Sequence, residues 1–337
     1  MNTFNSLHHL NLFLHMAMNY PKGSSFTPFF YNLGYRLQYI GLSIPVSSQK
    51  KEILSQYINS NINSVVTPEM IYRQENTNNY LLIECKLIDI VAKLDTRDSR
   101  QALGYLSLTD NELITYLGSL NNKKVTGMLE YSVLDEHIHS YNNNLKILSD
   151  VVDRAIGDHF PYRISSLKFE GSIIYYTYTL NGKKESIKIT SDPLLLLIPL
   201  DPDVNLKDEY GKKVLEENLR MTVANKICPF IGIMEFSFNL EEVCEEVIPV
   251  WGLWSRTSKR KIKELLKYYL NEISKELKKK GLQIEYNRGT YNIPMVSINI
   301  AEKVRGYFRV SDSNKIASDS INLLDQMVID EFTNEEL

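Results

Sequence analysis

The sequence predicts a mixed α/β fold, and three observations lead to this prediction. In roughly the first 150 residues, segments with helical periodicity alternate with short apolar segments typical of strands. The connections between these segments are mostly short. After residue 157 the pattern changes to a strong antiparallel hairpin signal, which favours a second unit with an α+β composition.

The bulk properties exclude several classes of protein. The 337 residues are enough for two domains, and 43% hydrophobic with 23% charged residues is typical of a globular chain. A net charge of -3 means that any basic surface for nucleic acid must be local. Cys85, Cys228 and Cys244 are too few and too scattered for a disulfide framework or a paired zinc site. We therefore expect a protein of the reducing cytoplasm.

No segment has the pattern of a membrane anchor or a signal peptide. The N-terminal apolar residues lack a basic leader and a small-residue cleavage site. The longest apolar run, residues 194–199, is far shorter than the ~20 residues of a membrane-spanning helix. We expect no membrane association, and we interpret residues 194–199 as a buried strand.

The elements of the first domain follow in order. A serine-led helix is predicted to start in the segment SSQKKEILSQYINSNI (47–62), where Ile53, Leu54, Tyr57 and Ile58 fall at helical spacing. Residues 70–72 and 80–83 are predicted to form a β-hairpin, because the asparagine-rich segment between them suits a turn. Asp95, Thr96 or Asp98 can cap the next helix, and a strand over 124–133 and a helix over 135–156 complete a domain of residues 1–157.

The second domain is expected over residues 158–337. It begins with a hairpin that turns at Asn181-Gly182. A long helix follows from about Lys259 to Lys280, and the segment YNIPMVSINIA (291–301) is predicted to be a strand. This domain would serve DNA engagement, oligomerisation or sensing.

Two acids and a lysine mark the ends of the predicted hairpin strands. Glu69 starts the first strand and Glu84 lies in its antiparallel neighbour, so both carboxylates can reach the same edge of the sheet. Two such carboxylates suit a hard cation such as Mg²⁺. Lys86 lies two residues after Glu84 and therefore projects from the same face. A cation that activates water beside an ammonium group is suited to phosphodiester hydrolysis.

These residues resemble a known motif. Pro68-Glu69 followed by Glu84-Cys85-Lys86 is similar to the signature of the PD-(D/E)xK nucleases, which have a restriction-endonuclease-like αβββαβ core with a mixed central sheet. Gln101 and Tyr105 resemble the Q-x-x-x-Y element of RecB-like and Cas4-like nucleases. The resemblance covers roughly residues 50 to 130, and the Q-x-x-x-Y spacing places both side chains on one helix face.

The resemblance implies a role for each matching residue. Glu69 and Glu84 would be metal ligands, Cys85 a ligand through its carbonyl, Lys86 a water-positioning base or charge stabiliser, Gln101 and Tyr105 a DNA-orienting pair, and Glu52 an additional upstream acid. The cofactor would be Mg²⁺ or Mn²⁺. Glu69 departs from the pattern, because the family more often has Asp there.

Two further groups of residues have alternative interpretations. The basic start of the long helix, with Lys259, Arg260, Lys261 and Lys263, can contact phosphates or can be the solvated face of an amphipathic helix. His137 and His139 have the spacing of a metal pair on a strand, but a polar helix start is the favoured interpretation.

We therefore expect a magnesium-dependent deoxyribonuclease, an endonuclease of restriction or antiphage defence. Its partners would be DNA and a second copy of the chain or another subunit of a defence complex. The alternative is a non-catalytic nucleic-acid-binding or scaffold subunit that keeps a nuclease-like fold, and Glu69 is the feature that motivates it.

Overall fold

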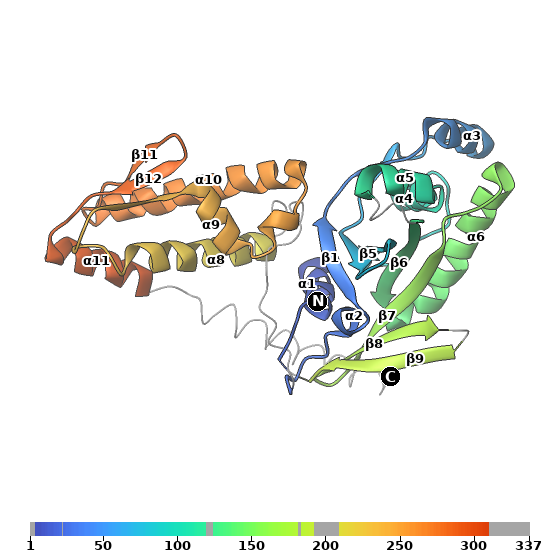
Figure 1. Cartoon of the computed structure of the whole chain (residues 1–337), viewed down its shortest axis with the longest axis horizontal. Coiled ribbons are helices and arrows are strands. Elements are labelled where there is room, and N and C mark those ends of the chain that lie inside the picture. Colours follow the sequence, from blue (N-terminus) through green and yellow to red (C-terminus); the bar gives the residue numbers. More distant parts are fainter. Residues whose placement is uncertain (1–3, 22, 119–123, 181–182, 192–208, 310–337) are drawn as a thin grey trace, which may run out of the picture. The chain divides into compact units, whose positions relative to one another are not determined.

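The computed structural model describes residues 4–21, 23–118, 124–180, 183–191 and 209–309 (Figure 1). The chain forms two compact units, and the division falls between strand β9 (Lys183–Thr190) and helix α8 (Glu209–Ile227). The predicted buried strand at 194–199 lies outside the described residues. Among the described helices, none is both long and apolar enough to cross a bilayer.

The first unit is built on a mixed seven-stranded sheet, which confirms the predicted α/β class. Its order is β1-β4-β5-β6-β7-β8-β9. The bounds are β1 Tyr35–Ile40, β4 Met70–Gln74, β5 Asn79–Cys85, β6 Thr126–Leu134, β7 Tyr162–Glu170 and β8 Ile173–Leu180. The pairs β5–β6 and β6–β7 are parallel and the other pairs are antiparallel. A separate short pair joins β2 (Ile44–Pro45) to β3 (Val65–Val66).

The predicted hairpin is confirmed, and its register is set on both sides. Met70 lies opposite Ile83 across β4 and β5, while Tyr35 of β1 lies opposite Gln74. A one-residue slip would turn every buried side chain of these strands to the wrong face, so the buried pattern of β5 fixes the register.

Helices cover both faces of the sheet (Figure 1). Helices α3 (Ser48–Ile58), α4 (Arg97–Leu106), α5 (Asp110–Leu117) and α6 (Ile138–Ile156) supply the core that includes Leu82, Leu129 and Val133. On the opposite face, α1 (Ser6–Met16) and α2 (Phe29–Asn32) pack aromatic rings on the sheet. The helix predicted to start within 47–62 is confirmed and ends at Ile58, where Asn59 adopts the left-handed conformation. The predicted helix over 135–156 is also confirmed and begins with a 3₁₀ turn at Asp135–His137.

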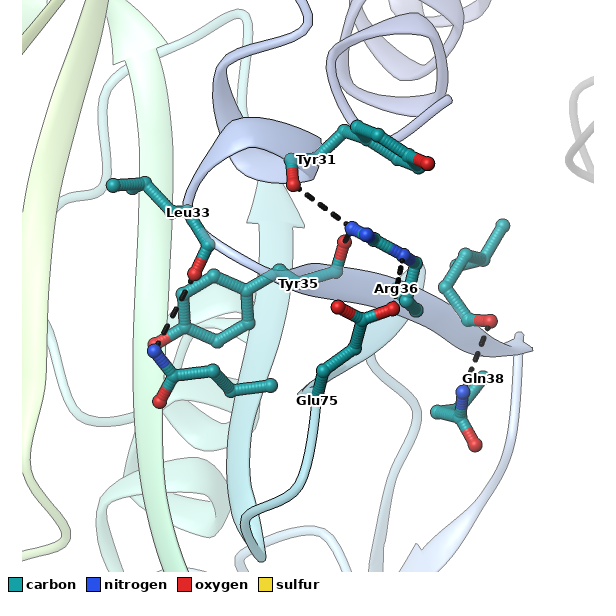
Figure 2. A network of polar contacts seen from close by, with 8 residues as sticks. Tyr31, Leu33, Tyr35, Arg36, Gln38 and Glu75 are labelled. Atoms are coloured by element: carbon teal, nitrogen blue, oxygen red, sulfur yellow. Dashed lines mark hydrogen bonds and ion pairs between the residues drawn. The ribbon is translucent and has the colours of Figure 1, made fainter. Parts of the chain in front are cut away.

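A polar network ties α2 and β1 to the turn of the hairpin (Figure 2). The Arg36 guanidinium lies 3.6 Å from the centre of the Tyr31 ring and pairs with Glu75 at 2.9 Å. It also donates to the backbone carbonyls of Tyr31 and Tyr35. Glu75 belongs to the turn between β4 and β5, so this network anchors the end of the hairpin opposite to Glu69 and Glu84.

The first unit extends beyond the expected boundary at residue 157. Strand β7 pairs in parallel with β6, and β8 and β9 continue the same sheet. The predicted hairpin at 173–190 exists, but it lies in the first unit and not in the accessory domain. Helix α6 lies between β6 and β7 along the chain, so their parallel pairing is a long-range contact. Local sequence patterns do not reveal such a contact.

The second unit has an α+β composition. Strands β10 (Phe236–Asn239), β12 (Thr290–Ile293) and β11 (Glu285–Asn287) form an antiparallel sheet in that order. The helices are α8, α9 (Leu240–Val247), α10 (Arg256–Lys279) and α11 (Ile298–Arg309), with a 3₁₀ turn at Trp251–Leu253. The long helix predicted from about Lys259 to Lys280 is confirmed as α10.

The predicted strand over 291–301 is wrong in its second half. Strand β12 ends at Ile293, immediately before Pro294, which has no backbone N–H to donate to a sheet. From Ile298 the chain is helical, and Ala301, Val304 and Phe308 form its buried side. The helical spacing of these three residues therefore outweighs the β-branched composition of the segment.

A buried carboxylate lies on the face of the sheet covered by α1 and α2. Glu130 of β6 is fully buried and accepts hydrogen bonds from Arg163, Ser165 and Tyr176. Burial lowers the pKa of Arg163, but Glu130 outweighs this effect and the pKa is raised overall. The Glu130 carboxylate thus connects side chains of β6, β7 and β8. Because an isolated buried charge is costly, Glu130 must stay paired with Arg163.

We predict that Arg163→Met lowers the free energy of unfolding by about 3–5 kcal/mol, because Glu130 would be left buried without its cation. Urea denaturation measures this change. The double variant Glu130→Leu with Arg163→Met removes both charges and should be more stable than Arg163→Met alone. A loss below about 1 kcal/mol in Arg163→Met, the value typical of an exposed pair, would contradict the account.

Candidate active site

The hairpin register brings the two predicted acids to one end of the sheet. Met70 pairs with Ile83, and the backbone N–H of Glu69 donates to the carbonyl of Ile83 at 3.1 Å. Glu69 therefore precedes β4 directly opposite Glu84 of β5. Residues opposite each other in an antiparallel pair project from the same face. That face is the one covered by α4 and α6.

Glu84 is the centre of a hydrogen-bonded cluster. Glu84 is only 2% exposed. Oε1 accepts from Lys86 Nζ at 2.8 Å and from Gln101 Nε2 at 2.9 Å, and Oε2 accepts from Tyr105 Oη at 2.7 Å. Lys86 Nζ also donates to Gln101 Oε1 at 3.3 Å. Four residues that the sequence singled out thus meet around one carboxylate.

Helix α4 positions Gln101 and Tyr105 for these contacts. Its N-cap is Thr96, one of the predicted candidates, whose hydroxyl accepts from the N–H of Ser99 at 3.2 Å. Leu103 is fully buried against the core, which fixes the rotation of the helix about its axis. Gln101 and Tyr105 are four residues apart and therefore project side by side toward β5.

Glu69 is tied to the residue between Glu84 and Lys86. Its Oε2 accepts from the backbone N–H of Cys85 at 2.5 Å. The Cys85 thiol lies on the opposite face of β5, where burial and the nearby Glu69 and Glu84 raise its pKa. The thiol is also hydrogen-bonded to the Glu69 side chain, which helps to keep it protonated. The backbone carbonyl of Cys85 is the group that the motif resemblance implies as a ligand.

The electrostatics of the site keep Lys86 protonated. Burial by itself lowers the pKa of Lys86, but Glu84, Glu69 and Asp98 outweigh this effect and raise the pKa above its usual value. Asp98 lies in the first turn of α4 and had been considered in the sequence only as a helix cap. It is the further acid whose charge acts on Lys86.

Three buried tyrosines, Tyr105, Tyr131 and Tyr141, form a chain of ring contacts next to Glu84. Tyr131 is the register partner of Glu84 on β6, and its ring lies 6.3 Å from Tyr105 and 5.3 Å from Tyr141. Burial, with a contribution from Glu84, raises the pKa of Tyr105 and Tyr141, so their hydroxyls stay protonated. Tyr131 and Tyr141 carry no recognisable sequence signal, because the parallel pairing of β5 with β6 is what brings them here.

Glu52 does not join this cluster. It is exposed on α3, where its carboxylate accepts from Gln56 of the same helix at 3.4 Å. Leu54 is the residue of α3 that is buried, so the helix turns Glu52 toward solvent. Within the described part of the chain, the acid near Lys86 from a helix is Asp98 and not Glu52.

The basic start of α10 lies in the second unit. Lys263 pairs with Glu241 at 2.5 Å, and the Lys259 ammonium lies 5.6 Å from the centre of the Trp251 ring. Arg260 and Lys261 are exposed. Trp251 and Trp254 are buried and cannot stack on bases. This burial favours the interpretation of the basic face as a solvated amphipathic surface over that of a phosphate contact.

His137 and His139 are not on a strand. His137 belongs to the 3₁₀ turn before α6, where Nδ1 lies 3.5 Å from Asp89 Oδ2, and His139 lies in α6. The alternative of a metal pair on a strand therefore does not apply, and the favoured interpretation as a polar helix start fits the structure.

The donor atoms around Glu84 fit a hard divalent cation. Throughout the described ranges, no group of three or more His, Cys, Asp or Glu side chains is arranged to hold a metal ion. Two carboxylates and the carbonyl of Cys85 are nevertheless an all-oxygen set. Mg²⁺ typically takes one or two carboxylates and fills its other positions with water and phosphate oxygens.

We predict that Lys86 does not titrate below about pH 10. A ¹³C NMR titration of the lysine Cε resonances, assigned with Lys86→Arg, measures this directly. Because the folded pKa is raised, the contribution of Lys86 to stability is fully present below its unfolded pKa and is lost only as the pH rises through the folded pKa. A midpoint below the usual lysine value would mean that burial outweighs the carboxylates.

Comparisons of this chain with protein-family models, with curated proteins and with solved structures found no match. Its assignment to a function therefore depends on the geometry around Glu84 and on the motif resemblance.

Proposed function

We propose that this protein is a deoxyribonuclease that hydrolyses phosphodiester bonds with Mg²⁺ or Mn²⁺, acting as an endonuclease. The observation that carries the proposal is the cluster around Glu84, in which Lys86, Gln101 and Tyr105 contact one buried carboxylate. An ordinary exposed Glu–Lys pair on a strand needs no such enclosure.

The order of elements supports the same proposal. Reading along the chain, α1, β1, β4, β5, α4 and β6 follow the expected αβββαβ sequence once the additional elements are set aside. These are α2 before β1, the segment β2-α3-β3 between β1 and β4, and α5 between α4 and β6. The first three of these strands are antiparallel neighbours, and β6 then adds in parallel beside β5. Glu69, Glu84 and Lys86 lie where the central strand of this arrangement ends.

The residues of the site can be given distinct tasks. Glu69, Glu84 and the carbonyl of Cys85 would hold the cation, which when bound supplies positive charge to phosphate oxygens and lowers the pKa of a water. Lys86 stays charged, which suits stabilisation of the negative phosphate better than proton abstraction. Gln101 and Tyr105 hold the Glu84 carboxylate in a fixed orientation.

The second candidate is a non-catalytic nucleic-acid-binding or scaffold subunit with a nuclease-like fold. A specific observation favours it. Both oxygens of Glu84 and one oxygen of Glu69 already have partners within the chain, so the cluster is satisfied without a cation. A setting in restriction or antiphage defence, with a second copy or another subunit as partner, depends on the motif resemblance alone.

We predict that the purified protein cleaves plasmid or linear DNA with Mg²⁺ or Mn²⁺ and that EDTA abolishes cleavage. Glu84→Ala and Lys86→Ala should each lower the rate by about 100-fold or more, because the first removes a ligand of the cation and the second removes the positive charge that stabilises the phosphate. Lys168 and Glu170 offer a matched control, since they form an exposed Lys–Glu pair two residues apart on β7. Lys168→Ala and Glu170→Ala should cleave like the wild type, and an RNA substrate tests the nucleic-acid class.

Glu69→Gln separates the two candidates. The glutamine can still accept from the Cys85 N–H, so the thermal unfolding temperature should stay unchanged. The loss of the carboxylate charge should abolish cleavage, because the cation loses a charged ligand. Cleavage that persists in Glu84→Ala and Lys86→Ala would contradict the site assignment. A wild type that binds DNA but cleaves it under no condition would establish the scaffold.

A further inference from the structure

The second unit carries a basic depression that the motif does not include. It has a volume of about 690 Å³ and is lined by Arg220 of α8, Lys279 and Lys280 at the end of α10, and Lys303, Gly306 and Tyr307 of α11. Four of these six residues are cations, and none of the described residues that line the depression is an acid. Residues from three helices thus concentrate positive charge in one place.

Two of the four cations are free to bind an anion. Lys280 and Lys303 are exposed, and the side chain of neither has an ion-pair or hydrogen-bond partner among the residues described. Lys279 pairs with Glu276 at 2.5 Å, so it contributes less. Burial raises the pKa of Tyr307, Arg220 opposes this rise, and Glu276 and Glu216 are close enough to raise the pKa further. The unpaired charge of the depression therefore comes from Lys280 and Lys303.

Arg220 of α8 is one of the residues that line the depression. Its Nη2 donates to the carbonyl of Tyr307 at 2.6 Å, and its guanidinium lies 4.2 Å from the centre of the Tyr307 ring. Its Nε is buried and has no hydrogen-bond partner in the described part of the chain. This cation joins α8 to α11 and adds its positive charge to that of Lys280 and Lys303.

The helix dipole does not account for the whole arrangement. Cations at the end of a helix are stabilised by its negative pole, which explains Lys279 and Lys280 at the end of α10. Lys303 lies in the middle of α11 and Arg220 inside α8, so neither position is explained in this way.

We propose that this basic depression binds backbone phosphates of DNA. This inference rests on the proposed function only in taking DNA as the ligand. Lysines that are exposed at the rim suit a phosphate backbone that passes over the surface, whereas an enclosed small ligand would bury them. The contact would hold DNA through the second unit, at the end of α10 that lies opposite to Lys259 and Arg260.

Gly306 provides a direct way to test the depression. A Cβ at this position would meet no atom within 4 Å, so a side chain here projects into open space. Glu is also a better helix former than Gly. Gly306→Glu therefore places a negative charge in the depression without removing any contact of the folded protein.

The experiment measures binding of the full-length protein to a short labelled DNA duplex by fluorescence anisotropy, in EDTA and over a range of salt concentrations. Lys280→Glu, Lys303→Glu and Gly306→Glu should each weaken binding by about 10-fold at low salt, and the two lysine variants should each reduce the salt slope by about one. Lys275→Glu is the matched control, because Lys275 is an exposed lysine of the same helix paired with Glu272. It should bind like the wild type.

Equal affinities of Lys280→Glu, Lys303→Glu and Lys275→Glu would overturn the proposal, as would a wild type that does not bind DNA. Displacement of the duplex by a mononucleotide at constant ionic strength would assign the depression to a small phosphorylated ligand and would also overturn it. Because the assay needs neither metal nor cleavage, its outcome is independent of the cleavage test at Glu84.

Discussion

Burying the carboxylate of Glu84 is costly unless the carboxylate is hydrogen-bonded and paired, and this requirement organises one end of the sheet. Lys86 follows from the same strand, while Gln101 and Tyr105 must come from α4. The helix therefore has to dock with one particular side against β5. The end of β5, helix α4 and the Lys86 ammonium are thereby fixed relative to one another. Catalytic sites need preorganisation of this kind.

The adjacent strand has the same kind of constraint on its other face. Glu130 of β6 is paired with Arg163 and is enclosed by Ser165 and Tyr176, beneath α1 and α2. The two clusters differ in one respect that matters for function. Glu84 lies at the end of its strand, where the chain leaves the sheet and Lys86 is 22% exposed, so a ligand can approach from that end. Glu130 lies within β6 and is fully enclosed, so a structural role suits it.

Local spacing explains which parts were predictable from the sequence. Glu84 and Lys86 share a face because they are two apart on a strand, and Gln101 and Tyr105 share one because they are four apart on a helix. The hairpin register then brings Glu69 opposite Glu84. The predictions that differ from the structure depended on non-local packing: the pairing of β7 with β6, which moved the boundary from 157, and the rotation of α3, which turns Glu52 to solvent. The convergence of Lys280 and Lys303 has no sequence signal for the same reason.

We propose that Glu69, Glu84 and the carbonyl of Cys85 hold one divalent cation. A crystal structure of the protein grown or soaked with Mn²⁺, with anomalous diffraction measured for wild type and Glu84→Gln, tests this most directly. The account predicts an anomalous peak within ligand distance of both carboxylates in the wild type and its loss in Glu84→Gln. A wild-type crystal in which Glu84 keeps its pairing with Lys86 and Mn²⁺ binds elsewhere, or nowhere, would contradict it.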